Sequence, residues 1–231
     1  VIARELAENG YKVSILEKRN HIGGNMYDYV DDYGILVHKY GPHTFHTRKK
    51  ELFDYMCKYA QWDEYRLTCG AEINGVCTPT PFNFQTIDDF YPEEEAGVLK
   101  SEIQKIFPER DTATVVEALT CGNELVENYA KFLFDNDYSL YSAKQWGVAP
   151  NEIDPSVLKR VPLRFNYEEG YFDDDFQVMP HVSFTSFFEN LLNHGNIEVR
   201  LNIDALDYMD VKEAEIYFDG KKANYPVIYS G

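Results

Sequence analysis

The chain has 231 residues, of which 44% are hydrophobic and 26% charged, as in folded globular proteins and unlike disordered or collagenous chains. No apolar run approaches the roughly 18 residues needed to cross a bilayer, so we expect neither a membrane-spanning segment nor a membrane partner. Lys and Arg number 22 against 39 Asp and Glu, and the net charge of −17 repels polyanions, which argues against nucleic acid as a partner. A small anion such as a nucleotide can still bind locally, because salt screens the net charge beyond about 8–10 Å.

The cysteine pattern gives no sign of a metal site. Cys57, Cys69, Cys77 and Cys121 show neither the C-x-x-C spacing nor the neighbouring histidines of a zinc site. We expect reduced, mostly buried thiols, which favours a cytoplasmic location.

The start of the chain has the pattern of the second half of a dinucleotide-binding βαβ unit. Residues 1–8 predict a helix that ends at Gly10, and residues 11–16 predict a short buried strand followed by Glu17. In such units an acid about 20 residues beyond a glycine-rich loop binds a ribose hydroxyl. Counting back from Glu17 puts that loop before Val1, so we expect the first strand and the glycine-rich loop to precede the given sequence.

Two loops that follow are candidates for contact with the dinucleotide. Gly23 and Gly24 come after the basic pair Lys18-Arg19, and adjacent glycines expose backbone amides that can lie against a pyrophosphate. Residues 37–47 place three histidines around a Gly-Pro turn. These histidines lack a carboxylate or cysteine partner at ligand spacing, so we predict no metal. Two interpretations stay open for them: hydrogen-bonded positions at the edge of a core, or a loop that faces the ring system of a cofactor.

The middle of the chain predicts a helical module between extended segments. A helix is expected at 50–59, a hairpin around Asn74-Gly75 within 66–76, and a helical pattern from Thr86 to about Leu133. The remaining expected elements are extended segments at 163–166, 171–172 and 176–179, a helix at 185–192, and strands at 197–202, 214–218 and 224–230. Because the last strand meets a glycine at the end of the sequence, we expect the fold to continue beyond it.

Several segments together resemble the UDP-galactopyranose mutases, flavoenzymes that interconvert the six-membered and five-membered ring forms of UDP-galactose. The resemblance covers essentially the whole chain, and its most specific parts are the Lys-Gln-Trp-Gly and Arg-Val-Pro sequences. One departure, Ser142 where Thr is commoner, keeps the hydroxyl. The matching segments are 1–7, 17–25, 38–47, 141–147, 159–164 and 229–231.

The resemblance implies an α/β fold in which an FAD-binding Rossmann-like domain carries an inserted helical module and an antiparallel sheet domain. The boundaries expected in chain order are 1–65 for the FAD-binding domain, 66–84 for the first part of the antiparallel sheet, 85–150 for the helical substrate module, 151–193 for the second part of the sheet, and 194–231 for the return to the FAD-binding domain.

The resemblance also implies which residues hold the two ligands. Trp146 would line the sugar pocket, and Arg160 would meet the diphosphate, for which the guanidinium fork is suited. The alternatives are a core position for Trp146 and a surface ion pair for Arg160. The expected cofactor-binding residues are Glu17, Arg19, Gly23, Gly24, Asn25, His43, Thr44 and His46. The expected substrate-binding residues are Asn83, Tyr141, Ser142, Trp146, Arg160 and Tyr171.

The reaction implied is the isomerisation of UDP-galactopyranose and UDP-galactofuranose through a covalent sugar adduct at N5 of reduced FAD. Because the cofactor carries this chemistry, no catalytic side chain is predicted. The implied partners are both ring forms of UDP-galactose and an external flavin reductant such as NAD(P)H, and a homodimer is compatible with the sequence. The product would supply cell-surface polysaccharide synthesis.

Two other functions stay open. An FAD-dependent oxidoreductase of the amine-oxidase type shares the Glu and Gly-Gly signature but needs no diphosphate arginine. A non-catalytic remnant that binds nucleotide is the second. With the glycine-rich loop and later segments outside the sequence, we expect these 231 residues alone to bind FAD poorly and to be inactive.

Overall fold

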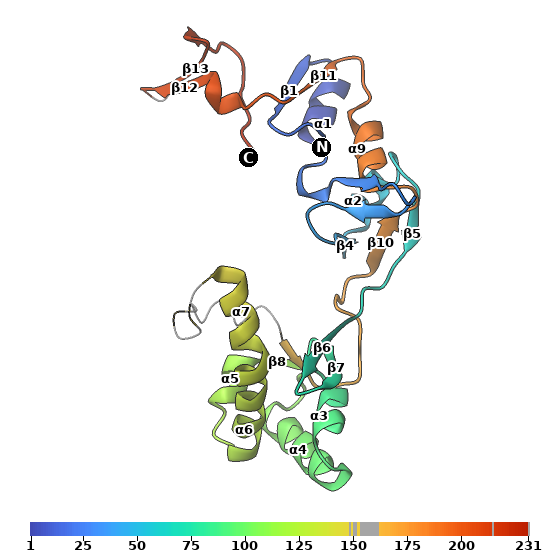
Figure 1. The fold of residues 1–231 in the computed structure, drawn as a ribbon, viewed down its shortest axis with the longest axis vertical. Coiled ribbons are helices and arrows are strands. Elements are labelled where there is room, and N and C mark those ends of the chain that lie inside the picture. The colour runs from blue at the N-terminus through green and yellow to red at the C-terminus, as the bar shows by residue number, and fades with distance from the viewer. Residues whose placement is uncertain (148, 150–151, 153–161, 214, 231) are drawn as a thin grey trace. The chain divides into compact units, whose positions relative to one another are not determined.

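The computed structural model describes residues 1–147, 149, 152, 162–213 and 215–230 (Figure 1). The chain forms two compact units: unit 1 contains Val1–Tyr65 and Asp174–Gly231, and unit 2 contains Arg66–Asp173. Unit 2 is therefore inserted, in chain order, between the two parts of unit 1. Within the described ranges, no helix is both long and apolar enough to cross a membrane.

The centre of unit 1 is a parallel strand pair. β1 (Val13–Glu17) pairs with β11 (Ile197–Leu201), from Val13 opposite Ile197 to Glu17 opposite Leu201. The helix α1 (Ile2–Glu8) precedes β1, and Gly10 between them has a φ of 87°, which favours glycine. The helix, glycine, strand and acid thus occur in the predicted order.

Short antiparallel strands and two helices complete this part of unit 1. Met56, Tyr59, Phe187 and Leu191 form its buried core, which joins the two helices. The remaining elements are the 3₁₀ turn η1 (Gly24–Met26), the hairpin β2 (Asp28–Val30) and β3 (Leu36–His38), the sheet of β4 (Phe45–Thr47), β10 (Phe176–Pro180) and β5 (Trp62–Glu64) in the order β4-β10-β5, α2 (Lys50–Met56) and α9 (Phe184–Leu192).

A buried carboxylate fastens α9 to this hairpin. Asp28 is 2% exposed, and its two oxygens accept hydrogen bonds from the backbone N–H groups of Phe184 (2.7 Å) and Thr185 (2.8 Å). The Thr185 hydroxyl donates back to the Asp28 carbonyl at 2.7 Å. An anion is favoured at the N-terminus of a helix, where backbone donors have no partner within the helix. The contact therefore fixes α9 against the start of β2.

The end of unit 1 departs from the sequence prediction. A small antiparallel sheet forms there, but residues 224–230 do not form the predicted strand. Ile228 and Tyr229 are more than half exposed, and none of the described strands pairs with this segment. Apolar residues form a strand only where a neighbour takes up their backbone hydrogen bonds. The elements of this end are η4 (Ala205–Asp207), β12 (Met209–Lys212), β13 (Glu215–Phe218) and β14 (Lys221–Lys222).

Unit 2 is mainly helical. Its core is built from buried residues of the helices, among them Leu99, Val126 and Leu133. The predicted hairpin is confirmed, with Asn74 and Gly75 at φ of 53° and 82°, the two positive values that a tight two-residue turn requires. The elements are β6 (Cys69–Ile73), β7 (Val76–Thr80), α3 (Phe84–Phe90), α4 (Glu93–Ile106), β8 (Thr112–Thr114), α5 (Val115–Leu119), α6 (Glu124–Leu133), the π-helical turn η2 (Phe134–Tyr138), α7 (Ser139–Trp146) and β9 (Pro162–Arg164).

The structure divides the expected antiparallel sheet domain between the two units. The pairs β6–β7 and β8–β9 lie in unit 2, whereas β10 pairs with β4 and β5 in unit 1. The segment 174–193 therefore belongs with the first 65 residues. Strand pairing across the sequence decides this, and the local pattern of each strand does not reveal its partner.

The prediction of buried cysteines is wrong. All four are free thiols, Cys57 and Cys77 are exposed, and Cys69 and Cys121 are half-buried. Cys77 lies opposite Glu72 in the β6–β7 ladder, and both side chains are exposed. Which face of a strand is buried is decided by packing of the whole unit.

The N-terminal cap of α5 contains a carboxyl group whose pKa is lowered by folding. Hydrogen bonds from Arg110 and then from Thr114 lower the pKa of Glu117 from its usual 4.5 to about 2. A carboxyl with a lowered pKa in the folded state stabilises above its unfolded pKa, and the contribution disappears as pH falls from about 4.5 to about 2. Because Glu117 is 43% exposed, we expect Glu117→Gln to lower the free energy of unfolding by only about 0.5–1 kcal/mol at pH 7.

Urea titrations at pH 7, 4 and 2.5 would check this. The difference between the parent and Glu117→Gln should shrink as the pH falls. Glu109→Gln, which removes an exposed carboxylate of the preceding loop, serves as the charge-matched control and should change little at any pH. A difference for Glu117→Gln that is the same at pH 7 and pH 2.5 would contradict the assignment.

Candidate functional site

The carboxyl end of β1 carries the acid predicted to bind a ribose. Glu17 Oε1 accepts a hydrogen bond from the backbone N–H of Arg19 at 2.8 Å. The chain beyond β11 closes the same corner, because the N–H of Ile203 donates to the Glu17 carbonyl and that of Asn202 to the Arg19 carbonyl, both at 3.0 Å. Ligands of open α/β sheets bind outside the carboxyl ends of the strands. Glu17 therefore stands where such a ligand would be bound.

Arg19 lies beside Glu17 with one donor unused. Its Nη2 donates to Asn25 Oδ1 at 2.8 Å, and its guanidinium carbon lies 4.5 Å from the centre of the Tyr40 ring. Its Nη1 is buried and has no hydrogen-bond partner in the part of the chain that the structure describes. A buried donor without a partner costs about 1–3 kcal/mol. The arrangement therefore fits an anion, such as a phosphate oxygen of a dinucleotide.

His21, which the sequence analysis did not select, holds this loop in place. It is 7% exposed, and its ring stacks on Tyr27 at 3.8 Å between centroids. Its Nε2 lies 2.8 Å from the Tyr40 hydroxyl and its Nδ1 2.9 Å from the Ile22 carbonyl oxygen. His21 thus connects the loop after β1 to the tyrosine under Arg19. The sequence signal for His21 is its place two residues before the Gly23-Gly24 pair.

The two adjacent glycines are needed for different reasons. Both have positive φ, 86° at Gly23 and 58° at Gly24. A Cβ at Gly23 would lie 3.2 Å from Cδ2 of Phe188, which is a close contact, whereas a Cβ at Gly24 would meet nothing within 4 Å. The backbone at Gly24 is therefore open to a ligand, in agreement with the unused donor of Arg19.

The predicted residues of the histidine loop are held by local contacts. The Nδ1 of His43 lies 2.8 Å from the Gly41 carbonyl oxygen, and the backbone N–H of His43 donates to Nδ1 of His38 at 3.2 Å. His46, in β4, is exposed, and its Nδ1 forms a hydrogen bond with the Asp174 side chain. Thr44 is half-buried between them. Nowhere in the described ranges do three or more His, Cys, Asp or Glu side chains gather as a metal ion would require.

In unit 2, two of the predicted substrate residues meet at one loop. Asn83 is 1% exposed and caps α3, since its Oδ1 accepts from the Gln85 N–H at 2.8 Å. Its Nδ2 donates to the Glu168 carbonyl at 3.0 Å. The loop continues to Tyr171, whose N–H donates to the Leu67 carbonyl at 2.7 Å. The side-chain oxygen and the side-chain nitrogen of Asn83 thus both have hydrogen-bond partners within the protein. The contact of Asn83 with a nucleotide stays a prediction.

The helix α7 presents two exposed aromatic side chains. Tyr141 and Trp146 are 60% and 58% exposed, whereas Ser142 between them is buried. The alternative of a core position for Trp146 is therefore wrong. Burial, followed by the charges of Cys69 and Tyr141, raises the pKa of Tyr171. Tyr171 thus lies within electrostatic reach of α7. Arg160 lies outside the described residues.

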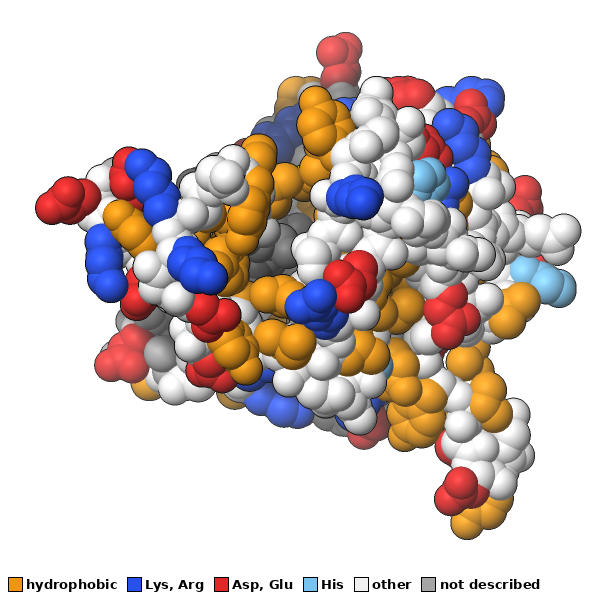
Figure 2. All heavy atoms as spheres, turned by 90° about the horizontal axis from the view of Figure 1, so that it is seen from above, with side chains coloured by type: hydrophobic (Ala, Val, Ile, Leu, Met, Phe, Trp, Pro, Cys, Tyr) orange, Lys and Arg blue, Asp and Glu red, His pale blue; other side chains and the backbone are white. Residues whose placement is uncertain are grey.

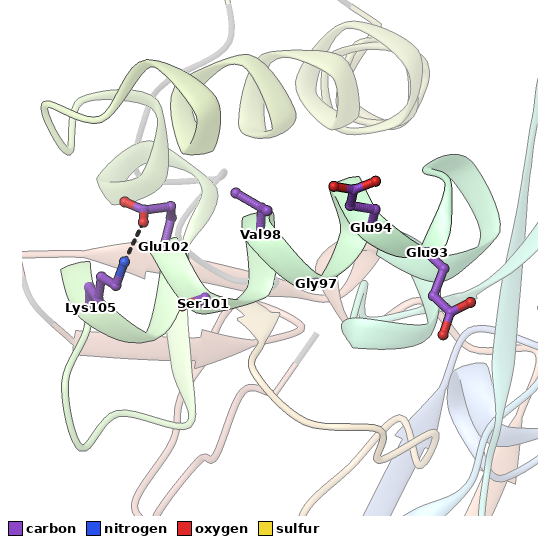
Figure 3. Close-up of a pocket in the computed structure, with 7 residues that line it drawn as sticks. All are labelled: Glu93, Glu94, Gly97, Val98, Ser101, Glu102 and Lys105. Atoms are coloured by element: carbon purple, nitrogen blue, oxygen red, sulfur yellow. Dashed lines mark hydrogen bonds and ion pairs between the residues drawn. The ribbon is translucent and has the colours of Figure 1, made fainter.

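A hollow runs along the outer face of α4 in unit 2, away from the predicted site residues (Figure 3). It is shallow, contains no predicted site residue, and its one ion pair joins Lys105 to Glu102 at 2.6 Å. On the face of the molecule in Figure 2, Lys and Arg are interspersed with Asp and Glu. The residues that line the hollow are Glu93, Glu94, Gly97, Val98, Ser101, Glu102 and Lys105.

Comparison with known proteins connects both units to one group of enzymes. The family model described as UDP-galactopyranose mutase matches residues 137–231, and one described as an NAD(P)-binding Rossmann-like domain matches residues 1–59. A crystal structure of reduced UDP-galactopyranose mutase resembles the chain with a TM-score of 0.62, covering 96% of this chain and 50% of that one at 19% identity. The predicted α/β class with a Rossmann-like N-terminal domain is confirmed.

Curated relatives agree. The chain is 36% identical to the probable UDP-galactopyranose mutase of Klebsiella pneumoniae, over 95% of this chain and 57% of the relative. It is 38% identical to the dTDP-fucopyranose mutase of Escherichia coli, over 87% of this chain and 52% of the relative. It is 32% identical to the UDP-galactopyranose mutase of Mycoplasma pneumoniae, over 100% of this chain and 58% of the relative. The chain spans little more than half the length of these relatives, and it is similar to them along 87–100% of its own length.

Proposed function

We propose that the protein carrying this chain interconverts UDP-galactopyranose and UDP-galactofuranose with reduced FAD as its cofactor. The observation that carries the proposal is similarity to sugar-nucleotide mutases along 87–100% of the chain. The geometry of unit 1 supports it: Glu17 ends β1, and Arg19, two residues later, has a buried donor without a partner in the described ranges.

The hydrogen-bonding groups of unit 1 suit the parts of an FAD dinucleotide. Glu17 would accept a hydrogen bond from the adenosine ribose, while Arg19 and the open backbone at Gly24 would face phosphate oxygens. His43, Thr44 and His46 would approach the flavin. Reduced FAD, when bound, supplies a nucleophilic N5 atom for the anomeric carbon of the sugar. The protein's share is then to bind, orient and enclose the two ligands, which is the usual division of work in cofactor enzymes.

The residues of unit 2 would bind the nucleotide sugar. Tyr141 and Trp146 offer exposed aromatic surfaces for the uracil or sugar rings. The hydroxyl of Tyr171 is protonated at neutral pH, as in an ordinary tyrosine, and can donate a hydrogen bond to the nucleotide. Arg160 would neutralise the diphosphate.

The direct test uses the protein expressed from its complete reading frame. The protein is reduced with dithionite, mixed with UDP-galactofuranose, and followed by chromatography. We expect UDP-galactopyranose to appear only with reduced flavin. A yellow protein that converts nothing would contradict the proposal and favour an amine-oxidase-type enzyme or a remnant. Turnover of dTDP-fucopyranose without turnover of UDP-galactofuranose would keep the mutase class and change the substrate.

The cofactor assignment predicts a specific loss in Arg19→Ala. Removal of a charge-assisted hydrogen bond to phosphate costs about 1.5–3 kcal/mol, so the Kd for FAD should rise about 10- to 100-fold. Fluorescence titration of the apoprotein with FAD measures this. Arg200→Ala is the matched control, because Arg200 of β11 is exposed and pairs with Glu198 on its own strand. Equal FAD affinity in Arg19→Ala and Arg200→Ala would remove Arg19 from the site.

The substrate assignment predicts the opposite selectivity for Arg160→Ala. Loss of a bidentate partner of the diphosphate should weaken UDP-sugar binding by about 100-fold, while FAD stays bound. Calorimetric titration with UDP-galactose and the flavin absorbance of the purified protein report the two quantities. The neighbouring Lys159→Ala controls for a general loss of positive charge. Unchanged UDP-sugar affinity would show that Arg160 is no part of the site.

A further inference from the structure

The segment 159–164 contains a second arginine, Arg164, which is buried and contacts the protein itself. Arg164 ends β9 and is 4% exposed, which is rare for an arginine. Its strand pairs with β8, with Arg164 opposite Thr112, and its backbone N–H donates to the Phe82 carbonyl at 2.8 Å. The backbone of Arg164 is thus held by β8 and by Phe82.

The guanidinium is bound to one loop, residues 168–173. Its Nη1 donates to the carbonyls of Gly170 and, at 3.4 Å, Glu168. Its Nη2 donates to the Tyr171 carbonyl at 3.3 Å and to Asp173 Oδ1 at 3.0 Å. Several acceptors around one side chain suit the multiple donors of the arginine fork, and the single ammonium of lysine cannot reach them together.

Other contacts also hold this loop, but each of them reaches only one of its residues. Asn83 holds the Glu168 carbonyl, a bridge joins Gly170 to Thr68, and the N–H of Tyr171 bonds to Leu67. The guanidinium of Arg164 donates hydrogen bonds to the Tyr171 carbonyl and to the carbonyls of Glu168 and Gly170, which precede it. The side chain of Arg164 therefore sets the backbone from which the Tyr171 ring projects.

We propose that Arg164 is a positioning residue that acts on nucleotide binding through Tyr171 and does not touch the ligand. Its burial and its bonds to loop carbonyls leave it turned to the protein, in contrast to the role given to Arg160 four residues earlier. The inference rests on the proposed function, because it takes from it that Tyr171 contacts the nucleotide.

The test is a double-mutant cycle on UDP binding in the full-length protein, with Arg164→Lys, Tyr171→Phe and both together. We expect each single change to raise the Kd for UDP about tenfold, and the double change to raise it no further, since both remove the same contact. A purely structural role would give independent effects, about 100-fold in the double variant. That additive result, or an unchanged Kd in Arg164→Lys, overturns the inference.

Two further variants keep the test decisive if Arg164→Lys folds poorly. Asp173→Asn removes only the charged partner of Arg164, and its loss of about two- to threefold should disappear in the Tyr171→Phe background. Arg66→Lys is the matched control: Arg66 is exposed and bonds the side chain of Glu168 in the same loop at 2.8 Å, so the Kd should change less than about twofold.

The outcomes separate the two proposals. A parent protein that binds UDP but does not isomerise the sugar overturns the mutase function, and the cycle still decides the role of Arg164. A parent protein that binds no UDP overturns both. Loss of coupling in the Asp173→Asn pair, with normal UDP binding by the parent, overturns the positioning role alone.

Discussion

The parallel pairing of β1 with β11 is the constraint on which unit 1 depends. Parallel neighbours need a long crossover, and here the chain between them includes the whole of unit 2. Only after the chain returns do the N–H groups of Asn202 and Ile203 reach the carbonyls of Arg19 and Glu17. The corner that would hold a ribose is therefore assembled from the first and last parts of the chain.

Two buried charged side chains, Asp28 and Arg164, each form hydrogen bonds with backbone groups. The carboxylate of Asp28 takes N–H groups at the start of α9, and the guanidinium of Arg164 takes carbonyls of the 168–173 loop. The negative carboxylate thus contacts backbone N–H groups, and the positive guanidinium contacts backbone carbonyl oxygens. A buried charge is tolerated when its hydrogen bonds are made, and it then fixes a loop more closely than apolar contacts do.

The predicted ligand-binding residues follow the division into units. The predicted cofactor residues lie in unit 1 around the end of β1 and the histidine loop, and the described substrate residues lie in unit 2 on α7 and near the 168–173 loop. Under the proposed function, both sets would serve one reaction. In that proposal the cofactor would carry the bond changes, and the protein would bind and orient the ligands.

The sequence by itself determined the features that depend on neighbouring residues. Gly10 after a helix, Asn74-Gly75 between strands, and an acid at a strand end each have a local physical cause, and each is present in the structure. The ordered motifs were also enough to indicate the family. Tertiary structure decided the pairing of β10, the exposure of Cys77 and Trp146, and the failure of residues 224–230 to form a strand. It also decided the burial of Asp28 and Arg164, because burial and pairing depend on partners far away in the chain, which no local pattern specifies.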